Sequence, residues 1–191
     1  MDEIERPLGM VPLDGRGSLP YALVHGESLV AAASWALSTA EVDLFDFNVA
    51  FAQVRDAGRM LVVHDPLCPL TPSGFLAEAV AEAQRSGAVV VGVRPVTDTV
   101  KEYDGTELGG TVDRDRLVCV TSPVVLPVAV VAALDELPGI ETGDLATLVE
   151  RLAERFPVRH LEAPPLGRRI VDEGDLEVLA ALSESAGEDP A

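Results

Sequence analysis

The stretch Met60-Leu61-Val62-Val63-His64-Asp65 runs four apolar residues directly into a polar pair. A short continuous apolar run is typical of a strand buried on both faces of a parallel sheet. Ligands of open α/β sheets bind beyond the carboxyl ends of the strands. Asp65 is therefore a candidate site residue, as a carboxylate able to hold a divalent cation beside phosphates. The alternative is that Asp65 only caps the turn that follows, which is a common use of aspartate.

The segments around this strand predict an alternation of strands and helices. Upstream, we expect a strand over residues 9–13 and helices over 28–38 and 47–57. Downstream, Thr71 and Pro72 predict the start of a helix that ends at Gly87, before a buried strand at 88–93. This strand–helix–strand unit is the clearest βαβ signal, and its crossover should be right-handed. The predicted class is α/β, as a single domain over residues 1–191.

Residues 95–122 have a different character and predict a β-arm that projects from the sheet. Alternating β-branched residues flank the turn Asp104-Gly105, a pattern typical of a β-hairpin. A projecting arm needs a partner to cover it, so we expect a homodimer built through the arm. The rest of the chain predicts a strand at 117–120, helices at 127–136 and 143–154, a strand at 158–161, an edge segment at 168–171, a helix at 172–185 and a disordered tail at 186–191.

Composition narrows the class of protein further. Apolar residues make up 48% of the 191 residues and aromatic ones only 4%, so the core must be aliphatic. No window approaches the roughly 18 apolar residues of a membrane helix, the acidic N-terminus does not resemble a signal peptide, and two cysteines form no disulfide framework. We therefore expect a cytoplasmic protein that does not enter a membrane. The net charge of −18 argues against a nucleic-acid partner.

Four further features carry weaker chemical signals. Gly15 and Gly17 follow the first strand and could let backbone N–H groups approach a phosphate, although a plain turn explains them equally well. Lys101 is the only lysine and is either a phosphate ligand or a solvated arm residue. His64 more plausibly orients backbone than binds a metal, and Cys68 has no histidine partner that would make it a nucleophile.

Several motifs in order resemble those of the 2-C-methyl-D-erythritol 4-phosphate cytidylyltransferase family of isoprenoid synthesis. They are VVHD (62–65), PVTDTVK (95–101), TVDR (111–114), TSP (121–123) and the late arginine at position 169 followed by Asp175-Leu176. The resemblance covers about residues 60–182 and is weak before that. It implies a Rossmann-like nucleotidyltransferase sheet flanked by helices, with a β-arm for dimerisation. The implied reaction joins CTP to a sugar-alcohol phosphate and releases pyrophosphate with Mg²⁺.

The resemblance also implies roles for individual residues. Asp65 would approach the Mg²⁺ ion and the reacting phosphates. Thr99 and Arg114, on the arm, would bind the phosphorylated polyol across the dimer, with Lys101 as a further candidate. Arg169 stands where the family usually has a lysine for the same phosphate. The nucleotide would lie against Gly15 and Gly17.

The nucleotide half departs from the family pattern. The Gly-rich loop is short, and Asp14 brings negative charge where the triphosphate should lie. Tyr21 occupies the position of the catalytic lysine, for which Arg16 is the available replacement. A strand and a Gly-Gly-x-x-Arg-x-x-Ser base-binding motif are expected to be deleted between Trp35 and Arg59. The arginine that the family usually has soon after the Asp65 position is replaced within Pro66-Leu67-Cys68-Pro69.

Three functions are consistent with the sequence. The first is a divergent member with weak or lost activity, a pseudoenzyme that binds a small phosphorylated polyol at Thr99, Arg114 and Arg169. The second is an active nucleotidyltransferase with an altered nucleotide or substrate. The third is a dimeric, non-catalytic interaction protein. Tyr21 and the shortened loop favour the first.

Overall fold

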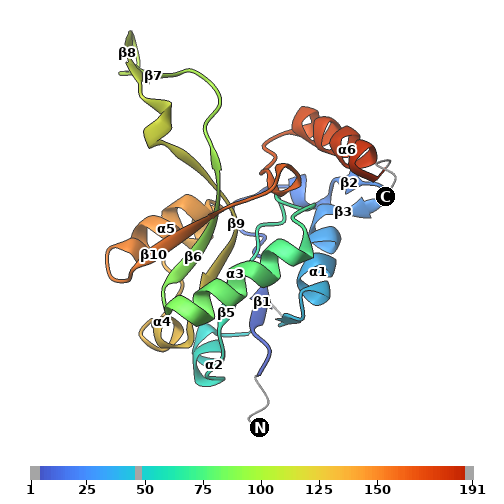
Figure 1. Cartoon of the computed structure of the whole chain (residues 1–191), viewed down its shortest axis with the longest axis vertical. Helices are drawn as coiled ribbons and strands as arrows, with labels where there is room; N and C mark the ends of the chain where they lie inside the picture. Colours follow the sequence, from blue (N-terminus) through green and yellow to red (C-terminus); the bar gives the residue numbers. More distant parts are fainter. Residues whose placement is uncertain (1–4, 46–48, 188–191) are drawn as a thin grey trace.

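A six-stranded mixed sheet forms the centre of the molecule in the computed structural model, which describes residues 5–45 and 49–187 (Figure 1). The strand order is β10-β6-β9-β5-β1-β4, and every neighbouring pair is parallel except those that involve β9. The strands are β1 (Leu8–Met10), β4 (Asp43–Leu44), β5 (Leu61–Val63), β6 (Val89–Pro95), β9 (Val118–Leu126) and β10 (Val158–Glu162). The predicted α/β class is confirmed.

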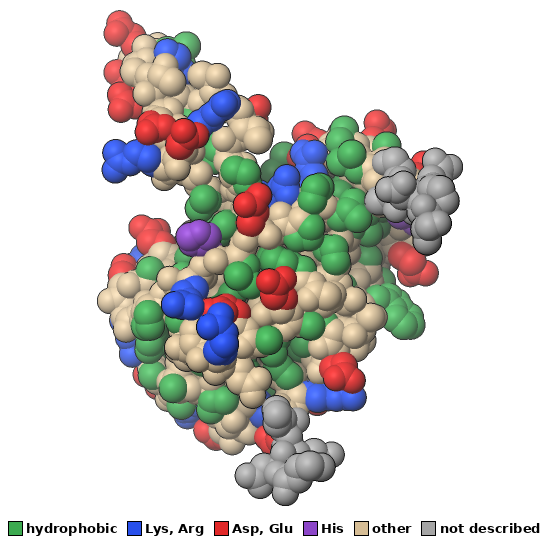
Figure 2. Space-filling view, in the orientation of Figure 1, with side chains coloured by type: hydrophobic (Ala, Val, Ile, Leu, Met, Phe, Trp, Pro, Cys, Tyr) green, Lys and Arg blue, Asp and Glu red, His purple; other side chains and the backbone are tan. Residues whose placement is uncertain are grey.

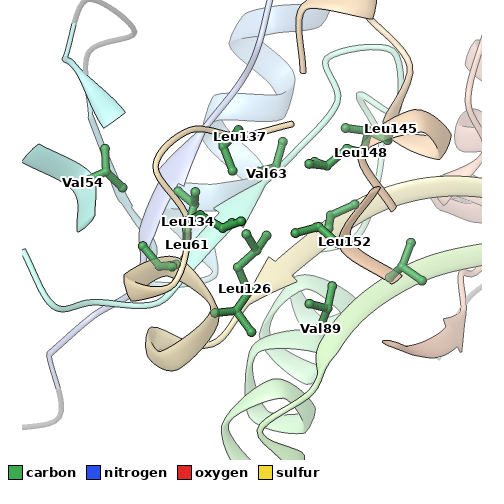
Figure 3. Packing of buried hydrophobic residues seen from close by; sticks show 14 of the residues in the cluster. Val54, Leu61, Val63, Val89, Leu126, Leu134, Leu137, Leu145, Leu148 and Leu152 are labelled. Carbon is green, nitrogen blue, oxygen red and sulfur yellow. The ribbon is translucent and has the colours of Figure 1, made fainter. Parts of the chain in front are cut away.

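Helices cover both faces of the sheet. Successive strand residues point to opposite sides, and in β5 the residues on both sides are apolar, so each face needs a covering layer. Leu61 and Val63 pack in one apolar layer with α2 (Phe51–Asp56), α4 (Val128–Ala132) and α5 (Leu145–Ala153), as Figure 3 shows. Val62 packs in the other layer, with α1 (Leu29–Thr39) and α3 (Ser73–Ser86). Strand β5 is thus buried on both faces, as its continuous apolar run predicts. No helix within residues 5–45 and 49–187 is both long and apolar enough to cross a bilayer.

A third apolar cluster fixes the loop beyond β5. Leu67, in that loop, packs with Ile170 and with residues of α6 (Glu173–Gly187) and of the small β2–β3 hairpin (Leu23–Val24 and Glu27–Ser28). The Ile170 N–H also donates to the Leu67 carbonyl at 2.8 Å. The loop after β5 is therefore tied to the segment before α6.

The arm is a β-hairpin with its own two-stranded sheet. Strands β7 (Val100–Tyr103) and β8 (Leu108–Val112) pair antiparallel and extend away from the body (Figure 1). The Asp104 carboxylate accepts backbone N–H bonds from Glu107 and Thr106, which lower its pKa to about 2 and shape the turn. The hairpin predicted within residues 95–122 is confirmed.

Several predicted boundaries are wrong. Helix α3 begins at Ser73 with Pro72 as its N-cap, because the Thr71 hydroxyl donates to the Cys68 carbonyl instead of capping the helix. Residues 168–171 form no strand. Helix α2 begins at Phe51, and the predicted helical residues 47 and 48 lie outside the described residues. Helix α6 runs to Gly187, so only 188–191 of the predicted tail lie outside the described part.

One prediction about topology also needs correction. The segment between Trp35 and Arg59 was expected to have lost its strand, but it contains β4, which pairs parallel with β1. Strands β5 and β6 run in the same direction around α3, as the predicted strand–helix–strand unit requires, and the antiparallel strand β9 is inserted between them. This insertion brings residues from far along the chain to the carboxyl end of β5.

Candidate functional site

Asp65 lies just beyond the carboxyl end of β5, and its side chain has no solvent exposure. Its Oδ1 accepts from Arg16 Nε at 2.8 Å and from the backbone N–H of Leu67 at 3.0 Å. Its Oδ2 accepts from Arg169 Nε at 3.0 Å. Two guanidinium groups therefore share one buried carboxylate, and we call these three side chains the Arg–Asp–Arg triad.

The two arginines of the triad are those that the sequence analysis assigns to the nucleotide (Arg16) and to the phosphate of the polyol (Arg169). The Arg16 side chain is fully buried, and its Nη1 donates to the Asp14 carbonyl at 2.8 Å. Arg169 is partly exposed and donates from Nη2 to the Gly143 carbonyl at 3.2 Å. The sequence predicted a site role for each of the three triad residues separately; the structure places them in direct contact.

A divalent cation does not fit this arrangement. Mg²⁺ binding requires free carboxylate oxygens, but both Asp65 oxygens already accept charge-assisted hydrogen bonds. Within the described residues, no group of three His, Cys, Asp or Glu side chains is arranged to hold a metal. A metal at Asp65 would have to displace an arginine, so the predicted Mg²⁺ site stays a prediction.

The glycine loop lies against another loop of the same chain. Gly15 has a left-handed φ of +72°, and a Cβ placed on it would lie 2.7 Å from the Gly143 nitrogen and from the Thr142 carbonyl. Gly17 also has a positive φ, of +59°, but a Cβ there would meet no atom of the described residues within 4 Å. Close backbone packing therefore accounts for Gly15. Tyr21 ends a short 3₁₀ helix nearby and is exposed.

The histidine before Asp65 is held neutral by its surroundings. His64 is fully buried, and burial lowers its pKa to about 4 against the opposing effect of the Asp65 charge. Its Nδ1 is hydrogen-bonded to the Ser122 hydroxyl, which also accepts from the Asp65 backbone N–H at 3.0 Å. His64 thus holds backbone in place through Ser122, as the sequence suggested.

Because the unfolded chain binds a proton at His64 near pH 6.5 and the folded chain only near pH 4, stability should fall as the pH drops through this window. The expected loss from this residue is about 2 kcal/mol between pH 7.5 and pH 5. Urea unfolding at a series of pH values would measure it, and His64→Gln should flatten that part of the curve. An equally steep curve in the variant would contradict the assignment to His64.

A cavity of about 370 Å³ lies next to the triad, at the base of the arm. Its wall includes Arg94, Arg168 and Arg169, together with Thr97, Cys119 and Thr121, and no carboxylate of the described residues lines it. Figure 2 shows basic side chains in the notch between the arm and the part of the body that carries α6. We call this cavity of about 370 Å³ the arginine cavity. In a protein of net charge −18 it is a local concentration of positive charge.

The predicted arm residues do not reach this cavity within one chain. Thr99 and Arg114 line a shallow depression on the arm itself, and Lys101 is exposed on β7. Arg114 Nη1 donates to the Thr97 carbonyl at the base of the arm. The structure therefore divides the predicted site residues into the triad on the body and a separate set on the arm.

Sequence reasoning missed two arginines of the cavity. Arg94 follows the apolar run of β6, and its Nη1 donates to the Ala163 carbonyl at 2.8 Å. Arg168 precedes Arg169 and pairs with Asp175 at 3.0 Å. A charged residue at the end of an otherwise apolar strand, and a pair of adjacent arginines, were the available signals.

Comparison with known proteins identifies the family. The sequence pattern of the IspD family, described as 2-C-methyl-D-erythritol 4-phosphate cytidylyltransferase, matches residues 47–179. That range contains Asp65, Arg169 and the arm, and excludes the glycine loop with Arg16.

Individual relatives agree with this match. The chain is 28% identical over 186 residues to the 2-C-methyl-D-erythritol 4-phosphate cytidylyltransferase of Acidobacterium capsulatum, covering 94% of this chain and 71% of that protein. It is 36% identical over 133 residues to the Rhodococcus opacus enzyme of the same name, covering 69% of this chain and 58% of the relative.

The fold agrees as well. The crystal structure of 2-C-methyl-D-erythritol 4-phosphate cytidylyltransferase from Thermus thermophilus aligns with a TM-score of 0.68 at 23% identity, over 95% of this chain and all of that one. Sequence pattern, relatives and fold converge, and the chain belongs to the 2-C-methyl-D-erythritol 4-phosphate cytidylyltransferase family.

Proposed function

We propose that this protein is a divergent family member that binds a small phosphorylated polyol and transfers cytidylyl groups from CTP weakly or not at all. The observation that carries the proposal is the closed state of the nucleotide half. Arg16 is directed at Asp65, and the Thr142–Gly143 backbone covers Gly15. Nucleotidyl transfer depends on positive charge positioned at the phosphates, and here that charge is neutralised in part by an internal carboxylate.

The acceptor half has the features that a phosphorylated ligand needs. The arginine cavity offers guanidinium groups, which match the geometry of phosphate oxygens. Its volume of about 370 Å³ is in the range of small-molecule sites. In this proposal Arg169 contacts the ligand from the body, and Thr99, Arg114 and Lys101 approach it from the arm of a second copy.

The homodimer is part of the same proposal. Tyr103 and Leu108 on the arm are 67% and 75% exposed, which is unusual for large apolar side chains on a projecting hairpin. Sedimentation equilibrium should give the mass of two chains, and Leu108→Asp should shift it toward one chain. A single-chain mass for the unmodified protein would remove the arm residues from the proposed site.

An active nucleotidyltransferase is the competing function, and a specific observation favours it. The family match spans Asp65 and Arg169, and the matched relatives carry the name of the enzyme. In that case Arg16 would release Asp65 when CTP binds and would itself contact the phosphates.

Calorimetric titration with CTP and Mg²⁺ separates the two functions. We expect no binding heat up to millimolar CTP, but measurable heat with 2-C-methyl-D-erythritol 4-phosphate. Micromolar CTP binding that weakens in Asp65→Asn but not in the exposed arm variant Asp98→Asn, together with pyrophosphate release on adding both substrates, would establish the enzyme instead. If neither CTP nor 2-C-methyl-D-erythritol 4-phosphate gives binding heat, the remaining function is that of a non-catalytic interaction protein.

A further inference from the structure

The arginine cavity carries more positive charge than one phosphate contact from Arg169 requires. Arg168 is paired with Asp175. In the Arg–Asp–Arg triad, two guanidinium groups share one carboxylate, so the triad carries an excess charge of +1. Within the described residues, Arg94 forms no ion pair and donates only to the Ala163 carbonyl. Two uncompensated positive charges therefore face the cavity from different elements.

Arg94 is held in the cavity wall by an irregularity in the sheet. The β6–β9 register shifts between Val91 and Val93, and a Cβ placed on Gly92 would lie 2.4 Å from the Ser122 carbonyl oxygen. After this bulge, Arg94 pairs with Cys119 of β9. Bulges of this kind re-aim the side chains that follow them. The position of Arg94 is thus set by the rigid centre of the sheet rather than by a loop.

A buried hydroxyl lies in the same wall. Thr121 is 2% exposed and lines the cavity, and its Oγ1 has no hydrogen-bond partner among the described residues. A buried polar group without a partner is costly. A ligand oxygen that entered this part of the cavity would meet the Arg94 guanidinium, and a shift of the wall would be needed to bring the buried Thr121 hydroxyl to the same oxygen.

We infer that Arg94, with Thr121 beside it, forms a second oxyanion subsite, so that the preferred ligand carries an acidic group in addition to its phosphate. This inference rests on the proposed function, which supplies the phosphate contact at Arg169. The ligand class is a phosphorylated sugar acid or a polyol with two phosphates. A neutral hydroxyl at this position would leave the Arg94 charge without a partner.

The chain contains a natural reporter for this subsite. Cys119 is exposed and lines the arginine cavity, whereas Cys68 is buried, and burial raises the pKa of the Cys68 thiol well above its usual range. Iodoacetamide should therefore alkylate Cys119 selectively in the full chain. The concentration of a ligand that halves the alkylation rate then measures its occupancy of the cavity.

Two probes that differ at one group test the inference. Glycerol 3-phosphate and 3-phosphoglycerate have the same length, but only the second has a carboxylate opposite the phosphate. We expect 3-phosphoglycerate to protect Cys119 at an about tenfold lower concentration, which corresponds to about 1.4 kcal/mol of binding free energy. Arg94→Gln should abolish this preference, Arg94→Lys should restore part of it, and the exposed control Arg151→Gln should leave it unchanged.

The outcomes separate this inference from the proposed function. Equal protection by the two probes in the unmodified protein, or a preference that persists in Arg94→Gln, would overturn the second subsite while leaving phosphate binding intact. Protection by neither probe would overturn both the subsite and the phosphorylated ligand. The CTP titration is read independently of all these results.

Discussion

Replacing Asp65 by alanine is expected to lower the free energy of unfolding by about 3–5 kcal/mol, because removal of one member of a buried ion pair leaves uncompensated charge. Here the loss leaves Arg16, which is fully buried, and Arg169, which is partly buried, close together without their carboxylate. An aspartate used only for catalysis would give little or no loss of stability. Urea denaturation followed by circular dichroism measures the difference directly.

A double-mutant cycle makes this prediction specific. Arg16→Gln combined with Asp65→Asn removes both charges, so the double variant should lose less stability than the two single variants added together. The exposed arm variant Asp98→Ala serves as the control for a simple change in net charge. Strict additivity of Arg16→Gln and Asp65→Asn would contradict an energetically coupled triad.

Gly15→Ala is the second change with a large expected effect. We expect a loss of about 2–4 kcal/mol, combining the cost of a left-handed non-glycine residue with the cost of overpacking. The atoms that a new Cβ would meet are backbone atoms of Thr142 and Gly143, which cannot rotate away. Thermal or urea unfolding in the absence of any nucleotide is the appropriate measurement.

Gly17→Ala is the matched control in the same loop. Gly17 shares the left-handed conformation but has open space around it, so it should lose only about 1–2 kcal/mol, the conformational part. If both glycines instead served a phosphate, the two variants would have similar stability and would differ from the unmodified protein in CTP binding. Equal losses of stability would argue against the packing role of Gly15.

Local sequence patterns predicted the elements of the fold well, because local physics determines them. The apolar run at 61–63 is a central strand, Ser28 accepts a hydrogen bond from Ala31 N at the start of α1, and Gly87 ends α3 with a φ of +67°. The pairing of strands depends on contacts far along the chain. The insertion of β9 between β5 and β6 therefore could not be derived from any local pattern.

In the candidate site, too, single residues could be predicted from the sequence, whereas the contacts between them could not. Asp65 could be singled out because it follows a buried strand, and Arg169 because of a resemblance. Their direct contact with Arg16 could not be predicted, since the three positions lie on separate segments that only the packed structure brings together. Arg94 was missed because its role depends on the bulge at Gly92, and a glycine in a strand gives little indication of which neighbour it re-aims.

The antiparallel pairing of β6 with β9 has a consequence for how the protein folds. Their register continues to Pro95 and Val118, so the two strands form one long hairpin whose connection, residues 96–117, carries the arm. Closing a longer connection costs only about 0.6 kcal/mol for each doubling of its length. The β6–β9 contact closes a shorter stretch of chain than the β5–β9 contact does, so it can form first. The arm can then change in length or sequence without altering the order in which the body assembles.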